Sequence, residues 1–211
     1  QTLRHENEAL LMVIDCTGHG VPGAFVTMIV KAIEREIVSR LIKSDYDIDP
    51  SLIMAYFNKT MRALLADHDQ SSHLHAGFDG GIVYINKDKK ILRYCGSQTP
   101  LFVIQDGQTR RIKGDRHSIG YKDSNPDFDF TQYSVDISTP TQIFLSTDGY
   151  FDQTGGKKGI MFGKKRFQRV IEQVESMDAK EQKKVLKETI DEYKKGHDTK
   201  DDLTVVGARI T

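Results

Sequence analysis

The chain of 211 residues lacks any apolar run long enough to span a membrane, so we expect no membrane contact by this domain itself. No segment has the pattern of a signal peptide. Disulfides are not expected either, because there are only two cysteines, Cys16 and Cys95, and reduced thiols are typical of a cytoplasmic protein. Charge of one sign is not in excess: 30 Lys and Arg residues balance 30 Asp and Glu residues. This balance argues against nucleic-acid binding, which needs clustered positive charge.

What is present fits a globular domain. Hydrophobic residues make up 38% and charged residues 28% of the chain, which is too apolar for wholesale disorder. The length is roughly 1.4 times a typical domain, so residues 1–211 are expected to form a single domain. The chain begins with Gln1 and enters a strand-like run at Ala9. We therefore expect it to be truncated at its N-terminus and to come from a longer sensor protein.

Hydrophobic periodicity predicts segregated strands and helices rather than an alternating order. Strands are predicted at 9–14, 81–85, 90–94, 101–104, 109–112, 128–135, 142–146 and 203–210, and helices at 22–37, 50–64, 165–174 and 179–194. The first helix is expected to bury Phe25, Met28, Ile29, Ala32, Ile33 and Ile37, and the second Leu52, Ile53, Tyr56, Phe57, Thr60, Met61 and Leu64. Segregation of this kind favours an antiparallel α+β fold.

Acidic residues stand at the ends of three predicted strands. Asp15 and Asp148 close apolar runs, and Asp201 and Asp202 open another. Antiparallel neighbours lie ~4.7–4.9 Å apart, so these carboxylates could converge at one sheet edge. Converging carboxylates stay ionised only around a positive charge, and Mg²⁺ or Mn²⁺ suits oxygen ligands. The structural alternative is local hydrogen bonding at turns, although glycines at 18, 20 and 149 would let backbone and water approach closely.

Two other functions compete for the same residues. The segment 18–23, GHGVPG, matches the glycine pattern of dinucleotide-binding turns. That site also needs a second parallel strand carrying an acid after the helix, and none is predicted here. A phosphotransferase with an aspartate nucleophile would usually carry D-x-D, whereas residues 15–17 are DCT.

Several single residues allow both a chemical and a structural interpretation. His19 could act as a general acid or simply fill the tight turn. The histidines at 68, 73 and 75 are either a metal cluster or solvated loop residues. The Cys16 thiol is reactive or packed inside. The basic cluster formed by Lys157, Lys158 and residues 164–166 either contacts phosphorylated or acidic partners or is a solvated face.

Three ordered motifs resemble a known family. They are DCTGHGVPGA at 15–24, STDG at 146–149 and DDLT at 201–204, with YCGSQTPL at 94–101 between them. Together they resemble the metal-dependent Ser/Thr protein phosphatases (the PPM superfamily), and they are most similar to its SpoIIE-like bacterial branch. The resemblance extends from about Leu10 to Ile210.

This resemblance implies a four-layer α-β-β-α sandwich, with two antiparallel sheets flanked by helices, and a centre of two Mn²⁺ or Mg²⁺ ions. Asp15 would bridge both ions, the Cys16 carbonyl would bind one, and Asp148 and Asp201 would hold the other. A bridging water would attack phosphorus in line, without a phospho-enzyme. His19, Gly18, Gly149 and Asp202 would support the centre. Asp152 matches an acid that supports a third ion in some relatives.

The same resemblance implies a substrate and partners. The activity would be hydrolysis of phosphoserine or phosphothreonine on a partner protein, by family pattern a STAS-type anti-sigma-factor antagonist. The family has a further ligand in a Gly-Asp motif, which we expect upstream of Gln1. The alternative is a non-catalytic binding or scaffold module that keeps the fold. The oligomeric state stays open, a homodimer being one alternative.

Overall fold

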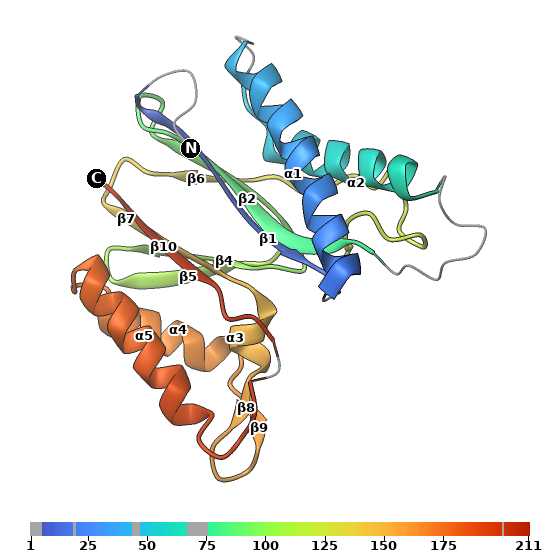
Figure 1. Ribbon diagram of the computed structural model, residues 1–211. Coiled ribbons are helices and arrows are strands. Elements are labelled where there is room, and N and C mark those ends of the chain that lie inside the picture. Colours follow the sequence, from blue (N-terminus) through green and yellow to red (C-terminus); the bar gives the residue numbers. More distant parts are fainter. Residues whose placement is uncertain (1–5, 19, 44–46, 67–75, 200) are drawn as a thin grey trace. The chain divides into compact units, whose positions relative to one another are not determined.

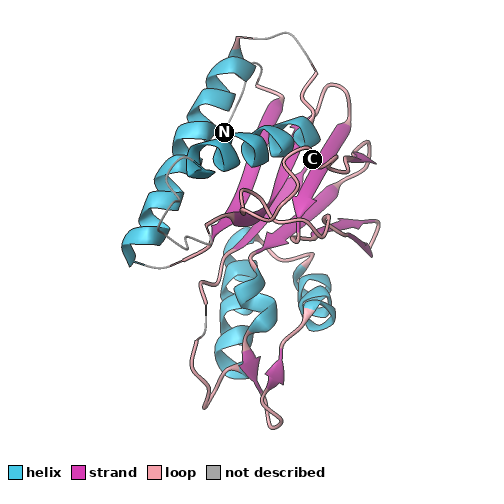
Figure 2. Cartoon of the chain, turned by 90° about the vertical axis from the view of Figure 1, so that its right-hand side faces the viewer, coloured by secondary structure: helices cyan, strands magenta, loops and turns pink. Residues whose placement is uncertain are grey.

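The computed structural model describes residues 6–18, 20–43, 47–66, 76–199 and 201–211 (Figures 1 and 2). The backbone forms two compact units. The first unit contains Gln1–Thr99 and Lys113–Ser138, and the second contains Pro100–Ile112 and Thr139–Thr211. Each unit holds one antiparallel four-stranded sheet.

The sheet of the first unit has the strand order β1-β2-β3-β6. Its strands are β1 (Glu8–Cys16), β2 (Phe78–Asn86), β3 (Ile91–Ser97) and β6 (Tyr133–Asp136). The hairpin of β2 and β3 agrees with the sequence prediction. β1 pairs along its whole length with β2, which joins the predicted first strand to the middle of the sheet.

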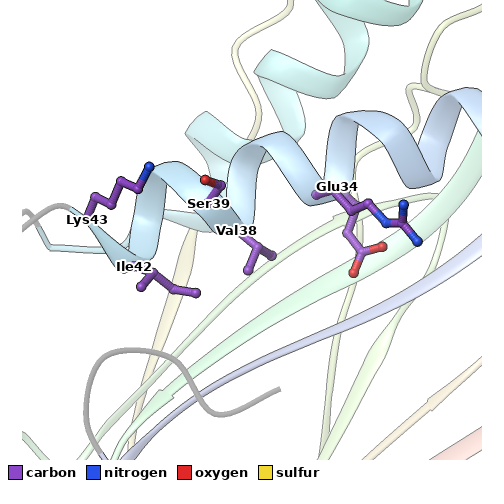
Figure 3. Close-up of a pocket in the computed structure, with 6 residues that line it drawn as sticks. Glu34, Val38, Ser39, Ile42 and Lys43 are labelled. Atoms are coloured by element: carbon purple, nitrogen blue, oxygen red, sulfur yellow. The ribbon is translucent and has the colours of Figure 1, made fainter.

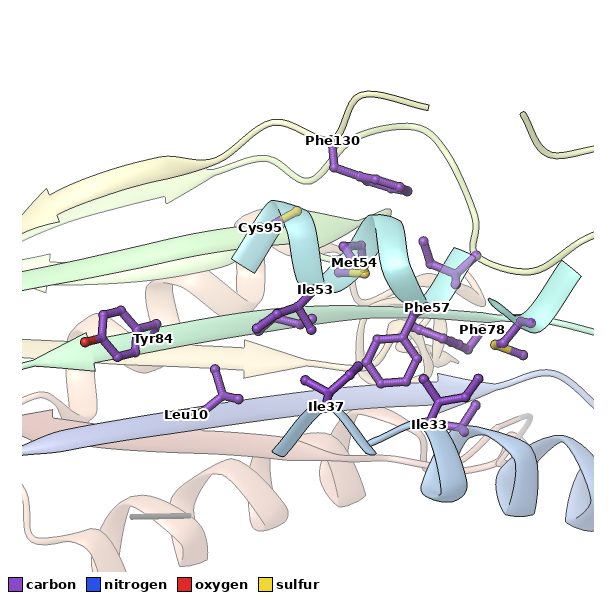
Figure 4. Close-up of a cluster of buried hydrophobic side chains, with 14 of the residues drawn as sticks. Leu10, Ile33, Ile37, Ile53, Met54, Phe57, Phe78, Tyr84, Cys95 and Phe130 are labelled. Carbon is purple, nitrogen blue, oxygen red and sulfur yellow. The ribbon is translucent and has the colours of Figure 1, made fainter. Parts of the chain in front are cut away.

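Two helices, α1 (Gly20–Ile42) and α2 (Pro50–Ala66), lie together on one face of this sheet (Figure 1). The helix α2 begins where predicted, because the Asp49 carboxylate accepts hydrogen bonds from the Ser51 amide and hydroxyl at 2.8 and 2.7 Å. Phe57 and Phe78 meet edge to face in the core between helices and sheet (Figure 4).

The predicted buried faces of both helices are partly wrong. On α1 the buried side chains include Val26, Val30, Ile33 and Ile37, whereas Phe25 and Met28 are exposed. On α2 the core positions are Ile53, Met54, Phe57 and Met61, with Leu52 and Leu64 exposed. Both helices carry apolar residues around much of their circumference, so periodicity alone left the rotation of each helix ambiguous.

The sheet of the second unit has the order β10-β7-β4-β5. Its strands are β4 (Leu101–Gln105), β5 (Gln108–Ile112), β7 (Thr141–Ser146) and β10 (Val205–Ile210). β4 and β5 form the predicted hairpin at Asp106 and Gly107, whose φ angles of 50° and 71° suit a tight two-residue turn.

The helices of the second unit are α3 (Asp148–Asp152), α4 (Lys164–Val174) and α5 (Ala179–Tyr193). A short hairpin of β8 (Thr154–Gly155) and β9 (Ile160–Met161) stands apart from the main sheet (Figure 2). An aromatic core holds the helices on the sheet: Phe102 of β4 contacts Phe151 and Phe167, with ring centroids 6.2 and 5.1 Å apart. Sequence periodicity predicted α4 and α5 but not α3 or the small hairpin.

The predicted strand at 128–135 is shorter than expected, because only Tyr133–Asp136 pairs in the sheet as β6. Phe128 instead stacks on His117 at 4.0 Å between ring centroids, and the Phe130 ring meets both edge-on. The antiparallel α+β class is confirmed. No helix in the described ranges is both long and apolar enough to cross a bilayer.

Candidate metal centre and active site

Asp15 lies at the end of β1, where the sequence places it, and directly opposite Asp79 of β2. Side chains at directly paired positions point to the same face of a sheet, with Cβ atoms about 4.5–5.5 Å apart. Both residues are half-buried. The first unit therefore holds two adjacent carboxylates, which repel each other unless a cation lies between them.

Asp79 is a site residue that the sequence analysis missed. It stands near the start of a strand that is otherwise almost entirely buried. The Ser97 hydroxyl of β3 lies within hydrogen-bond distance of its carboxylate, at 3.0 Å, and of the His117 carbonyl, at 2.7 Å, and its one proton is shared between these two acceptors. In the sequence, Asp79 could have been recognised as an acid just before the apolar run of a predicted strand. The structure adds that this end of the strand pairs with Asp15.

Tyr121 was also missed. Its ring packs on the backbone of Gly77, where a Cβ atom would lie 2.4 Å from the ring. Burial raises the pKa of the Tyr121 phenol, a hydrogen bond with Thr17 lowers it, and the charges of Asp79 and Asp15 raise it further. The phenol therefore stays protonated beside the two carboxylates and can donate a hydrogen bond there.

The turn after β1 is held by Thr17. Its amide donates to the Gly77 carbonyl at 3.0 Å, and its hydroxyl bonds both the carbonyl and the amide of Gly77 at 2.9 and 3.0 Å. Gly18 has a φ of +95°, and its carbonyl would lie 2.5 Å from a Cβ atom at position 23. Gly18 is needed for its positive φ angle and Gly23 for its close contact with Gly18. Together they fix the path of the backbone from Asp15 into α1.

Cys16 is a half-buried free thiol, and Cys95 is a buried one. Burial raises the pKa of the Cys16 thiol, a hydrogen bond with Thr27 lowers it, and the Asp15 charge raises it. These surroundings favour the neutral thiol over a reactive thiolate. The thiol therefore packs rather than reacts, and the predicted role of the Cys16 carbonyl as a ligand stays a prediction.

In the second unit, the chain around Asp148 approaches the chain around Asp201. Asp148 is the first residue of α3, and the next residue, Gly149, lies so close to the loop before β10 that a Cβ atom there would be 2.3 Å from the Asp202 carbonyl oxygen and 3.3 Å from the Asp201 Cβ atom. Asp148, Asp201 and Asp202 are all exposed. Gly149 thus has the close-approach role that the sequence suggested.

Hydrogen bonds from Thr147 hold this arrangement. Its hydroxyl donates to the Asp202 carbonyl at 3.0 Å and accepts from the Thr204 amide at 3.1 Å, while its amide donates to the Thr204 carbonyl at 3.1 Å. The Asp202 amide donates to the Asp201 carboxylate at 2.7 Å. The pairing of β7 with β10 therefore positions the second pair of acids.

Of the predicted acids, Asp148 and Asp201 lie near each other in the second unit, whereas Asp15 of the first unit is paired with Asp79, which was not predicted. Convergence of Asp15, Asp148 and Asp201 stays a prediction. Among the described residues, no three His, Cys, Asp or Glu side chains form a metal-binding group. The histidines at 19, 68, 73 and 75 lie outside the described residues.

The donors in both pairs suit a hard divalent cation. Each pair offers carboxylate oxygens, backbone carbonyls lie next to both, and Mg²⁺ and Mn²⁺ prefer such oxygen ligands. Asp15 and Asp79 face each other across adjacent strands, and this repulsion is relieved by bound positive charge. The chemistry of the residues present therefore fits the expected ions.

A hollow of about 310 Å³ on α1 is unrelated to these acids. Its lining comes from one helix, at Glu34, Arg35, Val38, Ser39, Ile42 and Lys43. Figure 3 shows that these side chains follow the last turns of α1. A hollow lined by a single helix lacks the convergent groups of a ligand site.

A comparison with protein families identifies the family of this chain. The family described as Stage II sporulation protein E (SpoIIE) matches residues 5–211. The chain belongs to the SpoIIE family. The match covers all the acids described above and includes both units. The predicted resemblance to the PPM phosphatases and their SpoIIE-like branch is confirmed.

Solved structures agree with this family. The SiaA-PP2C domain of Pseudomonas aeruginosa is 29% identical, with a TM-score of 0.83 over 98% of this chain and 78% of that one. The PP2C phosphatase domain of SpoIIE from Bacillus subtilis, solved with part of its regulatory domain, is 18% identical, with a TM-score of 0.71 over 98% of this chain and 55% of that one. RsbX in complex with magnesium is 14% identical, with a TM-score of 0.64 over 98% and 83%. A comparison with curated proteins gave no match.

This SpoIIE-family chain is thus a PP2C-like serine phosphatase domain. Phosphatases of this family use divalent metal ions, and the RsbX structure contains magnesium.

Proposed function

We propose that this chain is the catalytic domain of a Mn²⁺- or Mg²⁺-dependent phosphatase that hydrolyses phosphoserine or phosphothreonine on a partner regulatory protein. The observation that carries the proposal is the family match over residues 5–211. The positions of Asp15 at the end of β1 and of Asp148 and Asp201 beside the β7–β10 pair support it. The uncatalysed reaction is among the slowest known, so strong charge stabilisation is required.

We assign the ligands as the carboxylates of Asp15, Asp148 and Asp201 and the carbonyl of Cys16, as the family motifs imply. When bound, the two ions would neutralise phosphoryl oxygens and lower the pKa of a bound water, so that water attacks phosphorus directly. We add Asp79 as an acid that contributes negative charge beside Asp15. The Tyr121 phenol, hydrogen-bonded with Thr17, lies at the same end of β1 and close enough to feel the charges of Asp15 and Asp79.

The partner that the family motifs favour is a STAS-type anti-sigma-factor antagonist in its phosphorylated form. A cytoplasmic location is supported by the two free thiols, which a reducing compartment maintains. We also propose that residues 1–211 act as a single output domain in a signalling pathway.

A phosphatase assay on phosphoserine peptides tests the proposal. Activity should appear with Mn²⁺ or Mg²⁺ and disappear with a chelator. Asp148→Asn and Asp201→Asn should each reduce kcat at least about a hundredfold, because one carboxylate ligand loses its charge. Asp106→Asn in the β4–β5 turn is the matched control, since Asn tolerates the positive φ there. Full activity of Asp148→Asn would show that the assignment is wrong.

Titration calorimetry with Mn²⁺ separates this proposal from a non-catalytic scaffold module. A phosphatase should bind the ion at micromolar to millimolar concentration, and Asp15→Asn should weaken that binding. The absence of both Mn²⁺ binding and hydrolysis would favour the scaffold function. The paired rather than grouped acids of the described residues are the observation that keeps this alternative relevant.

A further inference from the structure

The second unit has a cavity of about 610 Å³ with a strongly basic lining, here called the basic cavity. Its cations are Arg111 of β5 and Lys164, Lys165, Arg166 and Arg169 of α4. Its acid is Asp152, the last residue of α3. Five cations against one acid make a local excess of positive charge in a chain whose net charge is zero.

One of these cations is structural. Arg166 donates hydrogen bonds to the carbonyls of Met161 and Phe162 at 3.0 and 2.8 Å, and its guanidinium lies 5.4 Å from the centre of the Tyr193 ring. It therefore fixes the chain between β9 and α4. The other four cations remain for a ligand.

These four cations have no anionic partner in the described part of the chain. Arg111, Lys164, Lys165 and Arg169 form no ion pair there. The Lys164 ammonium lies 5.5 Å from the centre of the Phe151 ring, and the other three side chains are exposed. Charges of one sign gathered around a concave surface attract an anion and repel each other without one.

The lining favours an acidic polypeptide over a nucleic acid. Its two aromatic rings, Phe151 and Phe162, are buried and cannot stack on bases. Met161 at the rim is 57% exposed and offers an apolar contact of the kind that a peptide side chain makes. An acidic segment could therefore pair with the cations and cover this methionine.

The basic cavity is also close to the proposed catalytic acid of its own unit. Asp152 in its lining and Asp148 are the two ends of α3, which spans about 6 Å at 1.5 Å per residue. An extended peptide advances ~3.3 Å per residue, so a few residues bridge this distance. A chain bound in the basic cavity can thus place a neighbouring phosphoserine near Asp148.

We propose that the basic cavity binds an acidic segment of the phosphoprotein substrate, next to its phosphorylated residue. This inference rests on the proposed phosphatase function and adds the class of sequence that the phosphatase prefers. Arg111, Lys164, Lys165 and Arg169 recognise the carboxylates, and Arg166 keeps the rim in place.

A binding assay and a hydrolysis assay test the proposed acidic-peptide site separately. The binding probe is a fluorescent, unphosphorylated glutamate-rich peptide, compared by anisotropy with a glutamine version. The variant is Lys165→Glu/Arg169→Glu, which should fold because both side chains are exposed and a glutamate in the first turn suits a helix N-terminus. We expect it to weaken glutamate-peptide binding about tenfold at low salt, and high salt to weaken wild-type binding.

The matched control is Lys180→Glu/Lys184→Glu, which changes the same charge at the same spacing on α5. It should leave peptide binding unchanged. In the hydrolysis assay, wild type should prefer a phosphoserine peptide with flanking glutamates over one with glutamines. Lys165→Glu/Arg169→Glu should abolish that preference through KM and leave hydrolysis of p-nitrophenyl phosphate intact.

Equal weakening by both double variants, or no weakening by Lys165→Glu/Arg169→Glu, overturns the proposal. So does tighter binding of single-stranded oligonucleotides or anionic lipid vesicles than of the glutamate peptide at the same salt. Peptide binding that behaves as expected without any hydrolysis would instead contradict the phosphatase function and leave the acidic-peptide site supported.

Discussion

Asp15 and Asp79 face each other across the antiparallel pair of β1 and β2, so two half-buried carboxylates share one position of the ladder. Like charges at paired positions destabilise a sheet by about 0.2–1 kcal/mol. A cation bound between the two carboxylates would relieve this repulsion and stabilise the first unit.

Asp79→Asn should raise the melting temperature of the metal-free protein by about 1–3 °C, because it removes the repulsion with Asp15. It should also raise the Mn²⁺ concentration for half-maximal activity roughly tenfold, since charge near the ions is lost. Thermal unfolding with a chelator and activity against Mn²⁺ measure the two effects. Ser97→Ala, which removes only the hydroxyl donor to Asp79, is the control and should not stabilise. A lower melting temperature with an unchanged Mn²⁺ response would contradict the prediction.

Gly149→Ala should destabilise the protein by about 2–4 kcal/mol, because the new methyl group would overlap the Asp202 carbonyl oxygen at 2.3 Å. Phosphatase activity should also fall, because the loop that carries Asp201 and Asp202 must move away from α3 to make room for the methyl group. Urea unfolding gives the free energy. Gly196→Ala is the comparison: its φ is +79° and a methyl group there meets no atom within 4 Å, so only about 1 kcal/mol is expected. Equal losses in the two variants would show that the close approach at Gly149 is unimportant.

Tyr121→Phe should lower kcat/KM on phosphopeptides about threefold to tenfold and shift the melting temperature by less than about 2 °C. The ring still packs on Gly77, but the hydroxyl that bonds Thr17 beside Asp15 and Asp79 is lost, and one hydrogen bond is worth about 0.5–1.5 kcal/mol. Because burial raises the phenol pKa, the loss should be the same from neutral to mildly alkaline pH. Tyr133→Phe on β6 should have no effect. A similar loss in both variants would contradict the assigned role.

Asp47 should contribute stability at neutral pH that is lost in acid. Its carboxylate accepts hydrogen bonds from Lys89 at 2.6 Å and Arg93 at 2.7 Å, which lower its pKa from 3.8 to about 2. A lowered pKa in the folded state means that the contribution is complete above about pH 4 and disappears as the pH falls to 2. Since the pair is largely exposed, Asp47→Asn should cost 1 kcal/mol or less at neutral pH.

Urea unfolding of wild type and Asp47→Asn across this pH range measures the difference. The gap between them should close as the pH falls from about 4 to 2, and it should narrow in high salt. Asp123→Asn, a change at another exposed carboxyl, is the control. A gap that stays constant with pH would show that the ion pairs are not its cause.

Local chemistry made parts of the fold predictable. The Asp106–Gly107 turn and the Asp49 cap each determine their own geometry, and both appear where predicted. The rotation of α1 did not follow from periodicity, because Phe25 and Met28 fit the same period as Val26 and Val30 with a different phase. Phe128 left the predicted strand because stacking on His117 replaced pairing in the sheet.

The site was predictable where motifs mark it. Asp15 lies three residues before Gly18, Asp148 directly precedes Gly149, and Asp201 is paired with Asp202, so their role can be proposed from the order of these motifs. Asp79 and Tyr121 carry no such mark. Asp79 lies beside Asp15 because of the register between β1 and β2. Tyr121 is brought to the site by its contact with Gly77, which is 44 residues earlier in the chain. Pairing and packing over such separations are decided by the tertiary structure.

The dependence of the Asp201 loop on Thr147 has a consequence for biosynthesis. Thr147 bonds the backbone of Asp202 and Thr204, which lead directly into β10. A nascent chain that has released β7 and α3 from the ribosome still lacks the strand that holds this loop. The acids of the second unit can take up their arrangement only after residues 205–210 have left the ribosome, so this part of the fold forms at the end of synthesis.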